Sequence, residues 1–407
     1  MKAHDYYANK ELIHLIQQLI RIPSHVHAPG REKEVARFIQ SYFQEAGIEA
    51  ELQPVDEERF NVMAFLKGSK ESNGRSLLLN GHTDTVPPDK TRQGPKEGSM
   101  EDGCIWGRGA VDMKGPLAAM IMAMVVIKRS GIQWPGSLVF AGVTGEETNS
   151  DGMESLACCE SCISGHGIQL DGAVVGEPTN FKYVASHRGL VWLDIHIKGK
   201  GAHSGKAHRG VNAIEKAVDF LARVKGELHP KLKERYHEHM GTSLMNIGTI
   251  EGGTGQSTVA EEALIRLDRR YISGETMESV IQEYQEIIDA MKQEDPDFQA
   301  EITRTPESVS LLPHPPLETK PGEPIIVATH EALTDLLGRE PELKTEYGWT
   351  DGALISKYMK IPTVVCGPGD ISLAHTSQER ISLEDLMKGV EFYANLAETF
   401  CQGKEAE

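Results

Sequence analysis

Short apolar runs that end at a histidine or an acidic residue are the feature that most restricts how this chain folds. Three such runs, with the residues that follow them, are 77–79 before His82 and Asp84, 137–143 before Glu146 and Glu147, and 173–176 before Glu177. Apolar runs of this length are typical of strands buried on both faces, as in a parallel sheet. Because open α/β sheets place ligand sites just beyond the carboxyl ends of their strands, we expect these side chains at one edge of one sheet.

The order of the expected elements predicts a mixed α/β domain whose sheet is mostly parallel and flanked by helices. Apolar residues recur at helical spacing in the first twenty residues and over 34–47, where Gly47 is a stop signal. The other expected elements are strands at 48–54, 61–66, 77–79, 137–143, 173–176 and 361–366 and helices at 116–128, 325–337 and 383–401. Strands and helices mixed in this order are characteristic of an α/β sheet.

The pattern changes near residue 186 and predicts a second domain inserted into the first. The expected strand at 190–197 alternates apolar and polar residues, as an antiparallel sheet with one buried face does. Helices at 211–224 and 277–291 and strands at 244–250, 263–271 and 299–303 complete a small α+β unit. We therefore expect a catalytic domain at 1–184 and 302–407 and an inserted domain at 185–301.

Charge and hydropathy exclude several classes of protein. The chain has 42 basic and 60 acidic residues, a formal net charge of −18, which opposes nucleic-acid binding because a phosphate backbone calls for a basic surface. The longest apolar run, at 117–127, is about half of what a membrane span needs. Charged residues among the first twenty argue against a signal peptide. We therefore expect no partner among nucleic acids or membranes.

The cysteines predict reduced thiols and a cytoplasmic location. They are Cys104, Cys158, Cys159, Cys162, Cys366 and Cys401. These six residues form no paired framework for a chain of this size. The cluster at 158–162 has no second Cys or His pair nearby, which disfavours a structural zinc site there.

His82 and Asp84 have the spacing of a metal ligand and the group that orients it. A neutral imidazole binds a divalent ion best when its other ring nitrogen donates to a fixed carboxylate. A histidine and an aspartate on a loop are, however, more often solvated polar residues. Asp112 precedes an expected helix and is equally well accounted for as its N-cap. Adjacent glutamates such as Glu146 and Glu147 are common on exposed turns.

Six residues taken together can form one site. Each follows an expected strand or opens the next helix: His82, Asp112, Glu146, Glu147, Glu177 and His375. Five of them suffice for two metal sites, with His82 and Glu177 on one ion. Glu147 and His375 hold the other ion, and Asp112 bridges both. Imidazole and carboxylate suit zinc, with cobalt or manganese as substitutes. Glu146 is left to take a proton from a metal-bridging water and pass it to a leaving amine, as the base and acid of a hydrolase.

Six motifs spread over nearly the whole chain carry a family resemblance. They are Gly-His-Thr-Asp-Thr-Val-Pro at 81–87, the glycine-rich segment 107–115, Gly-Glu-Glu at 145–147, Gly-Glu-Pro-Thr at 176–179, Gly-Ala-His-Ser-Gly at 201–205 and Ala-His-Thr-Ser at 374–377. Together they resemble the M20 family of di-zinc aminoacylases and peptidases, near acetylornithine deacetylase and succinyl-diaminopimelate desuccinylase. The resemblance implies two zinc ions per subunit on the five ligands above, with Asp84 orienting His82 and Glu146 as the base.

The resemblance also implies that the inserted domain is a lid through which two copies form a homodimer. His203 would reach the active site of the other copy and stabilise the oxyanion, where one donor contributes about 3 kcal/mol. Arg270 matches a lid arginine that grips a substrate carboxylate, although an unpaired surface arginine accounts for it equally well. Arg188 matches the hinge and substrate contact. Gly367 and Gly369 would lend backbone amides to the substrate.

The chain departs from the family pattern at two places, and the first departure leaves the contacts to the substrate end open. The family often carries Asn-x-Val-Pro-Asp after its lid glycines, but here the segment 252–256 is followed by Ser-Thr-Val-Ala-Glu at 257–261. Pro116 replaces a common second glycine, which the first turn of a helix tolerates.

Several functions remain open at this point. The first is a zinc-dependent amidohydrolase that removes a short acyl group from an N-acyl amino acid or related amine. The second is a dipeptidase or carboxypeptidase of the same family, and an N-formyl-aminopyrimidine deformylase is a third. A non-catalytic metal-binding relative is disfavoured, because such proteins usually lose a ligand or the base and none is missing here. The expected partner is a small N-acyl amine or a peptide.

Overall fold

The chain forms two compact units in the computed structural model, which describes residues 2–68, 74–89, 94–132, 135–306, 310–345 and 347–402. The first unit comprises Met1–Ala185, Glu318–Lys344 and Thr350–Glu407, and the second comprises Ser186–Leu317 and Thr345–Trp349. The second unit thus begins one residue later than the expected 185 and continues to 317 instead of 301.

Contacts of His314 explain why the second unit extends beyond residue 301. The carbonyl oxygen of His314 accepts hydrogen bonds from the Leu190 N–H at 3.0 Å and the Tyr271 hydroxyl at 2.7 Å. The His314 ring stacks on Trp349, with 4.2 Å between the ring centroids. These contacts hold both 310–317 and 347–349 to the second unit, and the spacing of apolar residues carries no sign of them.

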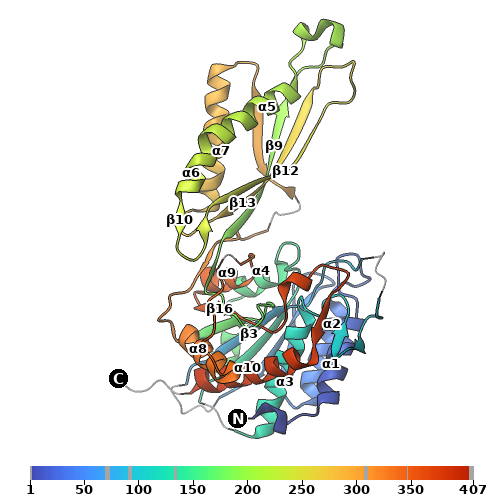
Figure 1. Ribbon diagram of the computed structural model, residues 1–407, viewed down its shortest axis with the longest axis vertical. Coiled ribbons are helices and arrows are strands. Elements are labelled where there is room, and N and C mark those ends of the chain that lie inside the picture. The colour runs from blue at the N-terminus through green and yellow to red at the C-terminus, as the bar shows by residue number, and fades with distance from the viewer. Residues whose placement is uncertain are drawn as a thin grey trace. The chain divides into compact units, whose positions relative to one another are not determined.

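The first unit is built on a six-stranded sheet with the order β1-β2-β6-β3-β7-β16. Figure 1 labels β3 and β16 of this sheet. The strands are β1 (Glu49–Pro54), β2 (Phe60–Leu66), β6 (Leu138–Val143), β3 (Leu77–His82), β7 (Gly172–Val175) and β16 (Thr363–Val365). β6, β3, β7 and β16 run parallel to one another, while β2 runs antiparallel to both of its neighbours, β1 and β6. The prediction of a mixed, mostly parallel sheet is therefore confirmed.

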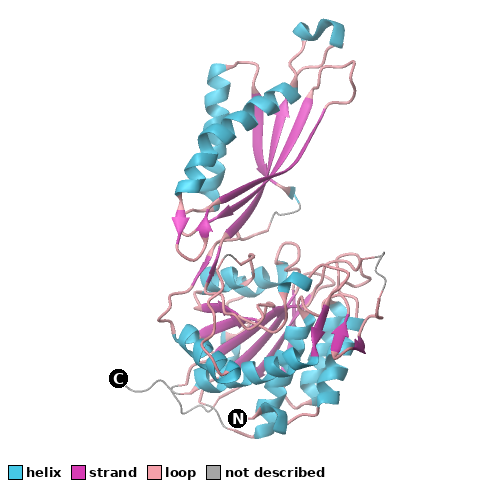
Figure 2. Cartoon of the chain, viewed as in Figure 1, coloured by secondary structure: helices cyan, strands magenta, loops and turns pink. Residues whose placement is uncertain are grey.

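Helices flank this sheet (Figure 2). They are α1 (Asn9–Arg21), α2 (Lys33–Glu45), α3 (Lys114–Ser130), α4 (Asp151–Cys158), α8 (Pro324–Leu337), α9 (Gly352–Leu354) and α10 (Leu383–Cys401). α3 packs on β3 and β6 and also contacts α1 and α10, so its residues from Lys114 to Ile127 are all buried. This burial on all sides explains why the apolar run at 117–127 has no polar face.

The parallel register brings the strand ends that lead to the candidate site residues to one edge of the sheet. His82 lies opposite Val143 in the pairing of β3 with β6, and Asn80 lies opposite Val175 in the pairing of β3 with β7. The strand expected at 77–79 extends to His82, so His82 is the last residue of β3 and not part of a turn. The chain after β6 and β7 then leads to its acidic residues beside the end of β3.

A small three-stranded sheet also belongs to the first unit. It has the order β17-β5-β4, from β4 (Ser99–Glu101), β5 (Cys104–Trp106) and β17 (Arg380–Ser382). β17 pairs antiparallel with β5, which joins the segment after His375 to the segment before Asp112. These strands were not expected from the sequence, because three residues are too few for a periodic pattern.

The second unit is built on a four-stranded antiparallel sheet with the order β12-β13-β9-β14. Its strands are β9 (Gly189–Lys198), β12 (Leu244–Gly252), β13 (Glu262–Tyr271) and β14 (Gln299–Arg304), and its helices are α5 (Ala213–Arg223), α6 (His229–Glu234) and α7 (Met277–Glu294). α5 and α7 pack on the sheet and enclose a separate apolar core. The expected α+β composition agrees with these elements.

The remaining elements are short. They are the strands β8 (Ser186–His187), β10 (Tyr236–His237), β11 (Gly241–Thr242) and β15 (Leu317–Glu318), and the helical turns η1 (Ala3–Asp5), η2 (Ser164–His166), η3 (Ser204–Arg209), η4 (Val224–Leu228), η6 (Ile355–Met359) and η7 (Ile371–Leu373). No helix among the described residues combines the length and apolar character needed to cross a membrane.

The expectation of reduced cysteines is wrong for one pair. Cys159 and Cys162 form a disulfide, with their Cα atoms 5.6 Å apart. This separation lies within the range that a disulfide requires. The turn after α4 brings the two thiols together, and such a local pairing leaves no trace in the long-range spacing of the cysteines.

Candidate metal centre

His82, at the end of β3, is held so that one ring nitrogen faces a cluster of carboxylates. The His82 side chain is 1% exposed. Its Nδ1 lies 2.9 Å from the backbone oxygen of Asp84, and its Nε2 lies 3.0 Å from Oδ1 of Asp112. Because a carbonyl oxygen only accepts, Nδ1 carries the proton and Nε2 is the nitrogen directed at the cluster.

Asp112 lies between the two histidines expected to bind metal. Its Oδ1 is 3.0 Å from Nε2 of His82, and its Oδ2 is 3.2 Å from Nε2 of His375. The same nitrogen of His375 is 2.9 Å from Oε1 of Glu147. One carboxylate therefore presents one oxygen to each histidine, which is the geometry required of a bridging ligand.

Glu177 and Glu146 complete the cluster. Oε1 of Glu177 is 3.7 Å from Nε2 of His82. His82, Glu146 and Glu177 place ligand-type atoms within 4.8 Å of one another, as do His82, Asp112 and Glu147. All six residues named as a constellation thus converge in the first unit. Distance alone does not separate Glu146 from the expected ligands.

The carboxylates of Asp112 and Glu177 are buried and those of Glu146 and Glu147 are half-buried, which carries an electrostatic cost. Burial raises the pKa of Glu146 well above its usual value, and the charge of Glu177 adds to this effect. Burial also raises the pKa of Glu177, with the charge of Asp112 adding. Buried charges require partners, so a group of acids this close calls for positive charge.

The histidines supply part of that positive charge. Burial opposes protonation of His82, but hydrogen bonds with Asp112 and Asp84 outweigh it and raise the His82 pKa well above its usual value. Hydrogen bonds with Asp112 and Glu147 raise the pKa of His375 to about 10. Divalent cations would replace these protons, and the donor set of imidazole and carboxylate fits zinc, cobalt or manganese.

Asp84 anchors two parts of the site. Its backbone oxygen makes the short contact to the His82 ring, whereas its Oδ1 is 3.5 Å from that ring. The expected orienting role therefore falls mainly on the backbone. The carboxylate instead accepts the N–H groups of Gly145 at 2.9 Å, Glu146 at 3.2 Å and Glu147 at 3.0 Å. Asp84 thus connects the position of His82 to the turn that carries both glutamates.

Three candidate residues belong to the second unit. His203 is exposed and caps η3, with its Nδ1 accepting the Gly205 N–H at 3.1 Å. Arg270 pairs with Asp268 on its own strand at 2.9 Å, and Arg188 donates to the backbone oxygen of Thr242 at 2.8 Å. Both arginines therefore already have partners within that unit.

The two glycines expected to contact substrate lie in the loop after β16. The N–H of Gly367 donates to Oγ1 of Thr179 at 3.1 Å, which weighs against its offering this amide to a substrate. The backbone of Gly369 has φ of +99°, a conformation that glycine adopts readily.

Asp351 and Glu379 are among the other buried acids of the first unit, which was not expected from the sequence. Asp351 is 1% exposed, and burial raises its pKa to about 7. Glu379 lies four residues after His375 and is also 1% exposed. Both stand in polar, loop-like segments, where the sequence has no periodic signal that distinguishes a buried acid from a solvated one.

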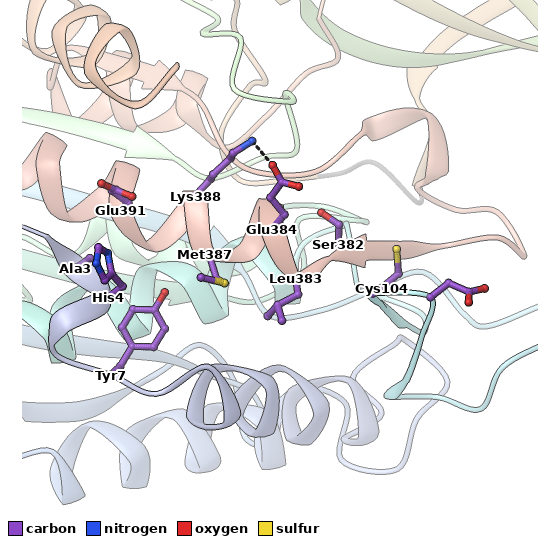
Figure 3. A pocket seen from close by; sticks show the side chains of 12 residues that line it. Ala3, His4, Tyr7, Cys104, Ser382, Leu383, Glu384, Met387, Lys388 and Glu391 are labelled. Atoms are coloured by element: carbon purple, nitrogen blue, oxygen red, sulfur yellow. Dashed lines mark hydrogen bonds and ion pairs between the residues drawn. The ribbon is translucent and has the colours of Figure 1, made fainter. Parts of the chain in front are cut away.

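A cavity of about 580 Å³ is lined by other parts of the first unit, namely the N-terminal segment, β5 and the start of α10. Figure 3 shows its lining, including Tyr7, Cys104 and Met387, with Glu384 directed at Lys388 and 2.7 Å from it. None of the candidate site residues lines this cavity. The candidate site is therefore defined by converging side chains and not by the shape of this cavity.

Comparison with known proteins agrees with the fold. The model of peptidase family M20/M25/M40 matches residues 78–399. The chain is 26% identical to the N-formyl-4-amino-5-aminomethyl-2-methylpyrimidine deformylase of Bacillus subtilis, over 98% of this chain and 96% of that protein. It is 30% identical to the acetylornithine deacetylase of Proteus mirabilis, over 97% of this chain and 98% of that protein.

Solved structures resemble the whole chain in fold. The M20 metallo-carboxypeptidase Sso-CP2 of Sulfolobus solfataricus has a TM-score of 0.77 at 17% identity, covering 96% of this chain and 99% of that one. The Bacillus subtilis YXEP protein, described as a dinuclear metal binding peptidase, has a TM-score of 0.71 at 18% identity, covering 97% of this chain and 99% of that one.

Replacing Asp84 with asparagine should loosen the turn that carries Glu146 and Glu147. Asparagine has a single acceptor oxygen, so at least one of the three N–H groups loses its partner. We expect the free energy of unfolding to fall by about 1–3 kcal/mol. Urea unfolding of Asp84→Asn measures this loss, and zinc content of the same preparation reports on the site.

The exposed Asp335 on α8 provides a matched control, since Asp335→Asn makes the same chemical change in the same unit. Unfolding curves that coincide for wild type and Asp84→Asn would contradict the anchoring role of Asp84.

Proposed function

The chain belongs to peptidase family M20/M25/M40 and is a hydrolase of amide bonds, and we propose that it removes a short acyl group from an amine in a metal-dependent reaction. The observation that carries the proposal is Asp112, which faces both His82 and His375 with its two oxygens. A shared carboxylate of this kind suits two neighbouring cations better than one.

The proposed ligands are assigned by their contacts. His82 and Glu177 would hold one ion, Glu147 and His375 the other, and Asp112 both. We propose zinc as the metal, with cobalt or manganese able to substitute, from the mixture of imidazole and carboxylate. Bound cations would supply Lewis acidity, which polarises an amide carbonyl and lowers the pKa of water.

Glu146 is proposed as the general base and acid. Its backbone N–H is fixed by Asp84, and its carboxylate lies in the same cluster as His82 and Glu177. A carboxylate oxygen of Glu146 would accept a proton from the attacking water. The resulting carboxyl group would then deliver this proton to the nitrogen of the leaving amine. Glu147, its neighbour, instead contacts His375 and is assigned to the metal.

The comparisons favour a short acyl group over a peptide. The full-length relatives at 26% and 30% identity are a deformylase and a deacetylase. The peptidases among the solved structures described above are 17% and 18% identical, and that likeness supports the fold alone. A dipeptidase or carboxypeptidase is the second candidate, because the same cluster hydrolyses either bond and only the substrate contacts differ.

We also propose that two copies associate through the second unit. β12 is an edge strand with an exposed Ile250, and Ile214 and Val218 of α5 are exposed as well. Ile214 lies against Gly252 at the end of β12, so an apolar surface adjoins the edge of the sheet. Natural proteins seldom leave such an edge uncovered. In this dimer His203 would stabilise the oxyanion at the other copy's metal centre.

Arg270 and Arg188 are proposed to bind the substrate end distant from the scissile bond. A guanidinium recognises a carboxylate through two parallel hydrogen bonds. For Arg270 this role requires exchange of its present partner Asp268. Gly369 remains a proposed backbone contact, while Gly367 is the weaker candidate because its N–H is engaged.

Replacing Glu146 with glutamine should abolish proton transfer while retaining the metal. We expect kcat to fall by about 10²- to 10⁴-fold, the range of general acid–base catalysis. Zinc content by atomic emission should match wild type. Chelation should remove wild-type activity, and added zinc or cobalt should restore it.

Glu160→Gln, an exposed change in the turn after α4, is the control. Turnover by Glu146→Gln equal to that of wild type would reject the assigned base, and wild-type activity that survives complete removal of metal would reject the proposed function.

A substrate panel separates the two candidate functions. N-formyl, N-acetyl and N-succinyl amines are compared with dipeptides at equal metal occupancy. We expect the best acyl amine to exceed the best dipeptide in kcat/KM by at least about tenfold, since pocket contacts readily discriminate at that level. A preference for dipeptides would replace the first candidate with the second.

Mixing two inactive variants tests the role of His203. His203→Ala and Glu146→Gln damage different parts of the site. If His203 acts in the other copy, each mixed dimer contains one site with both residues intact and one site that lacks both. Random reassociation of equal amounts then restores about a quarter of wild-type activity. Light scattering that finds only monomer, or a mixture without activity, would contradict this proposal.

A further inference from the structure

Glu379 is a buried acid that none of the assigned roles uses. Its Oε1 accepts the backbone N–H groups of Val111 at 3.1 Å and Asp112 at 3.2 Å. Its Oε2 pairs with the guanidinium of Arg108, whose side chain is also largely buried. Its backbone oxygen accepts the N–H of Gly107 at 3.2 Å. The segment from 107 to 112 is therefore folded around one residue.

This arrangement depends on the small sheet of the first unit. β17 pairs with β5 from Arg380 opposite Trp106 to Ser382 opposite Cys104. The pairing places Glu379, the residue before β17, beside Gly107, the residue after β5. The side chain of Glu379 then continues the contact into the loop, where no strand pairing is available to the N–H groups of Val111 and Asp112.

Glu379 also stands close to His375 along the chain. The intervening turn is closed by local hydrogen bonds, from the Thr376 hydroxyl to the Leu373 oxygen at 2.8 Å and from the Gln378 N–H to the Thr376 hydroxyl at 3.2 Å. Glu379 thus connects the segment that contains His375 with the segment that contains Asp112. Nε2 of His375 lies 3.2 Å from Oδ2 of Asp112.

Neutralising a buried arginine does not require these backbone contacts. A carboxylate that served only as the counter-charge of Arg108 would need no contact with the N–H of Asp112. The two hydrogen bonds on Oε1 satisfy buried donors of an irregular loop, and one donor belongs to the residue that faces both histidines. The second oxygen pairs with the guanidinium of Arg108.

We propose that Glu379 is a positioning residue of the metal centre: it holds the backbone of Asp112 at a set distance from His375 and thereby sets the affinity for metal. This inference rests on the proposed metal centre. Groups that orient ligands in this way typically change metal affinity by about 10- to 100-fold when they are lost.

Two variants separate the position of the carboxylate from its charge. Glu379→Asp keeps the charge but withdraws the oxygens by one methylene group, while Glu379→Gln keeps the reach and one acceptor oxygen but loses the charge. Glu384→Gln is the control, since Glu384 is an exposed acid nearby on α10 that pairs with Lys388. Zinc affinity is measured by competition with a chromophoric chelator, and thermal unfolding of the chelated proteins reports stability separately.

We expect zinc affinity to fall by about 10- to 100-fold in Glu379→Asp and by less than about tenfold in Glu379→Gln. The visible absorption of the cobalt-loaded proteins should change more in Glu379→Asp than in Glu379→Gln, because this absorption reports the geometry of the ligands. Glu384→Gln should match wild type in both measurements.

Zinc affinity of Glu379→Asp within about twofold of wild type, or a greater loss in Glu379→Gln than in Glu379→Asp, would overturn the inference. If Glu379→Asp does not fold, Glu379→Gln decides, and a cobalt spectrum identical to that of wild type would reject a positioning role. Wild type that binds no zinc would instead contradict the proposed metal centre itself.

Discussion

The gathering of acids in a buried place is the constraint on which the first unit depends. Asp112, Glu147 and Glu177 approach His82 or His375 closely, and Glu146 lies among them. Negative charges this close together are unfavourable unless positive charge is present. The two histidines offset only part of the negative charge of the carboxylates. The same arrangement that would destabilise an ordinary core is therefore well suited to the divalent cations proposed above.

Two further carboxylates bind the backbone beside this cluster without belonging to the proposed ligand set. Asp84 binds the N–H groups of the turn that carries Glu146 and Glu147, and Glu379 binds those of Val111 and Asp112. Both turns lie where strands have ended and no ladder satisfies the backbone. In both turns a buried carboxylate accepts these N–H groups instead.

The two units divide the proposed work between chemistry and recognition. All proposed metal ligands and Glu146 belong to the first unit, whereas His203, Arg188 and Arg270 belong to the second. Each unit has its own apolar core. The proteins to which the chain is similar include a deformylase and a deacetylase, whose names indicate different substrates.

The mixed α/β fold, the inserted α+β unit and the six residues of the cluster could be predicted from the amino-acid sequence. Apolar runs mark buried parallel strands, and polar residues directly after several such runs are typical of a ligand site at the edge of a sheet. The strands β4, β5 and β17, the extension of the second unit to His314 and Trp349, and the disulfide of Cys159 with Cys162 could not be predicted in this way. The burial of Asp351 and Glu379 could not be predicted either. These features depend on contacts between residues distant in the chain or on turns without periodicity, because an acid in a loop becomes solvated or enclosed only when the rest of the fold closes around it.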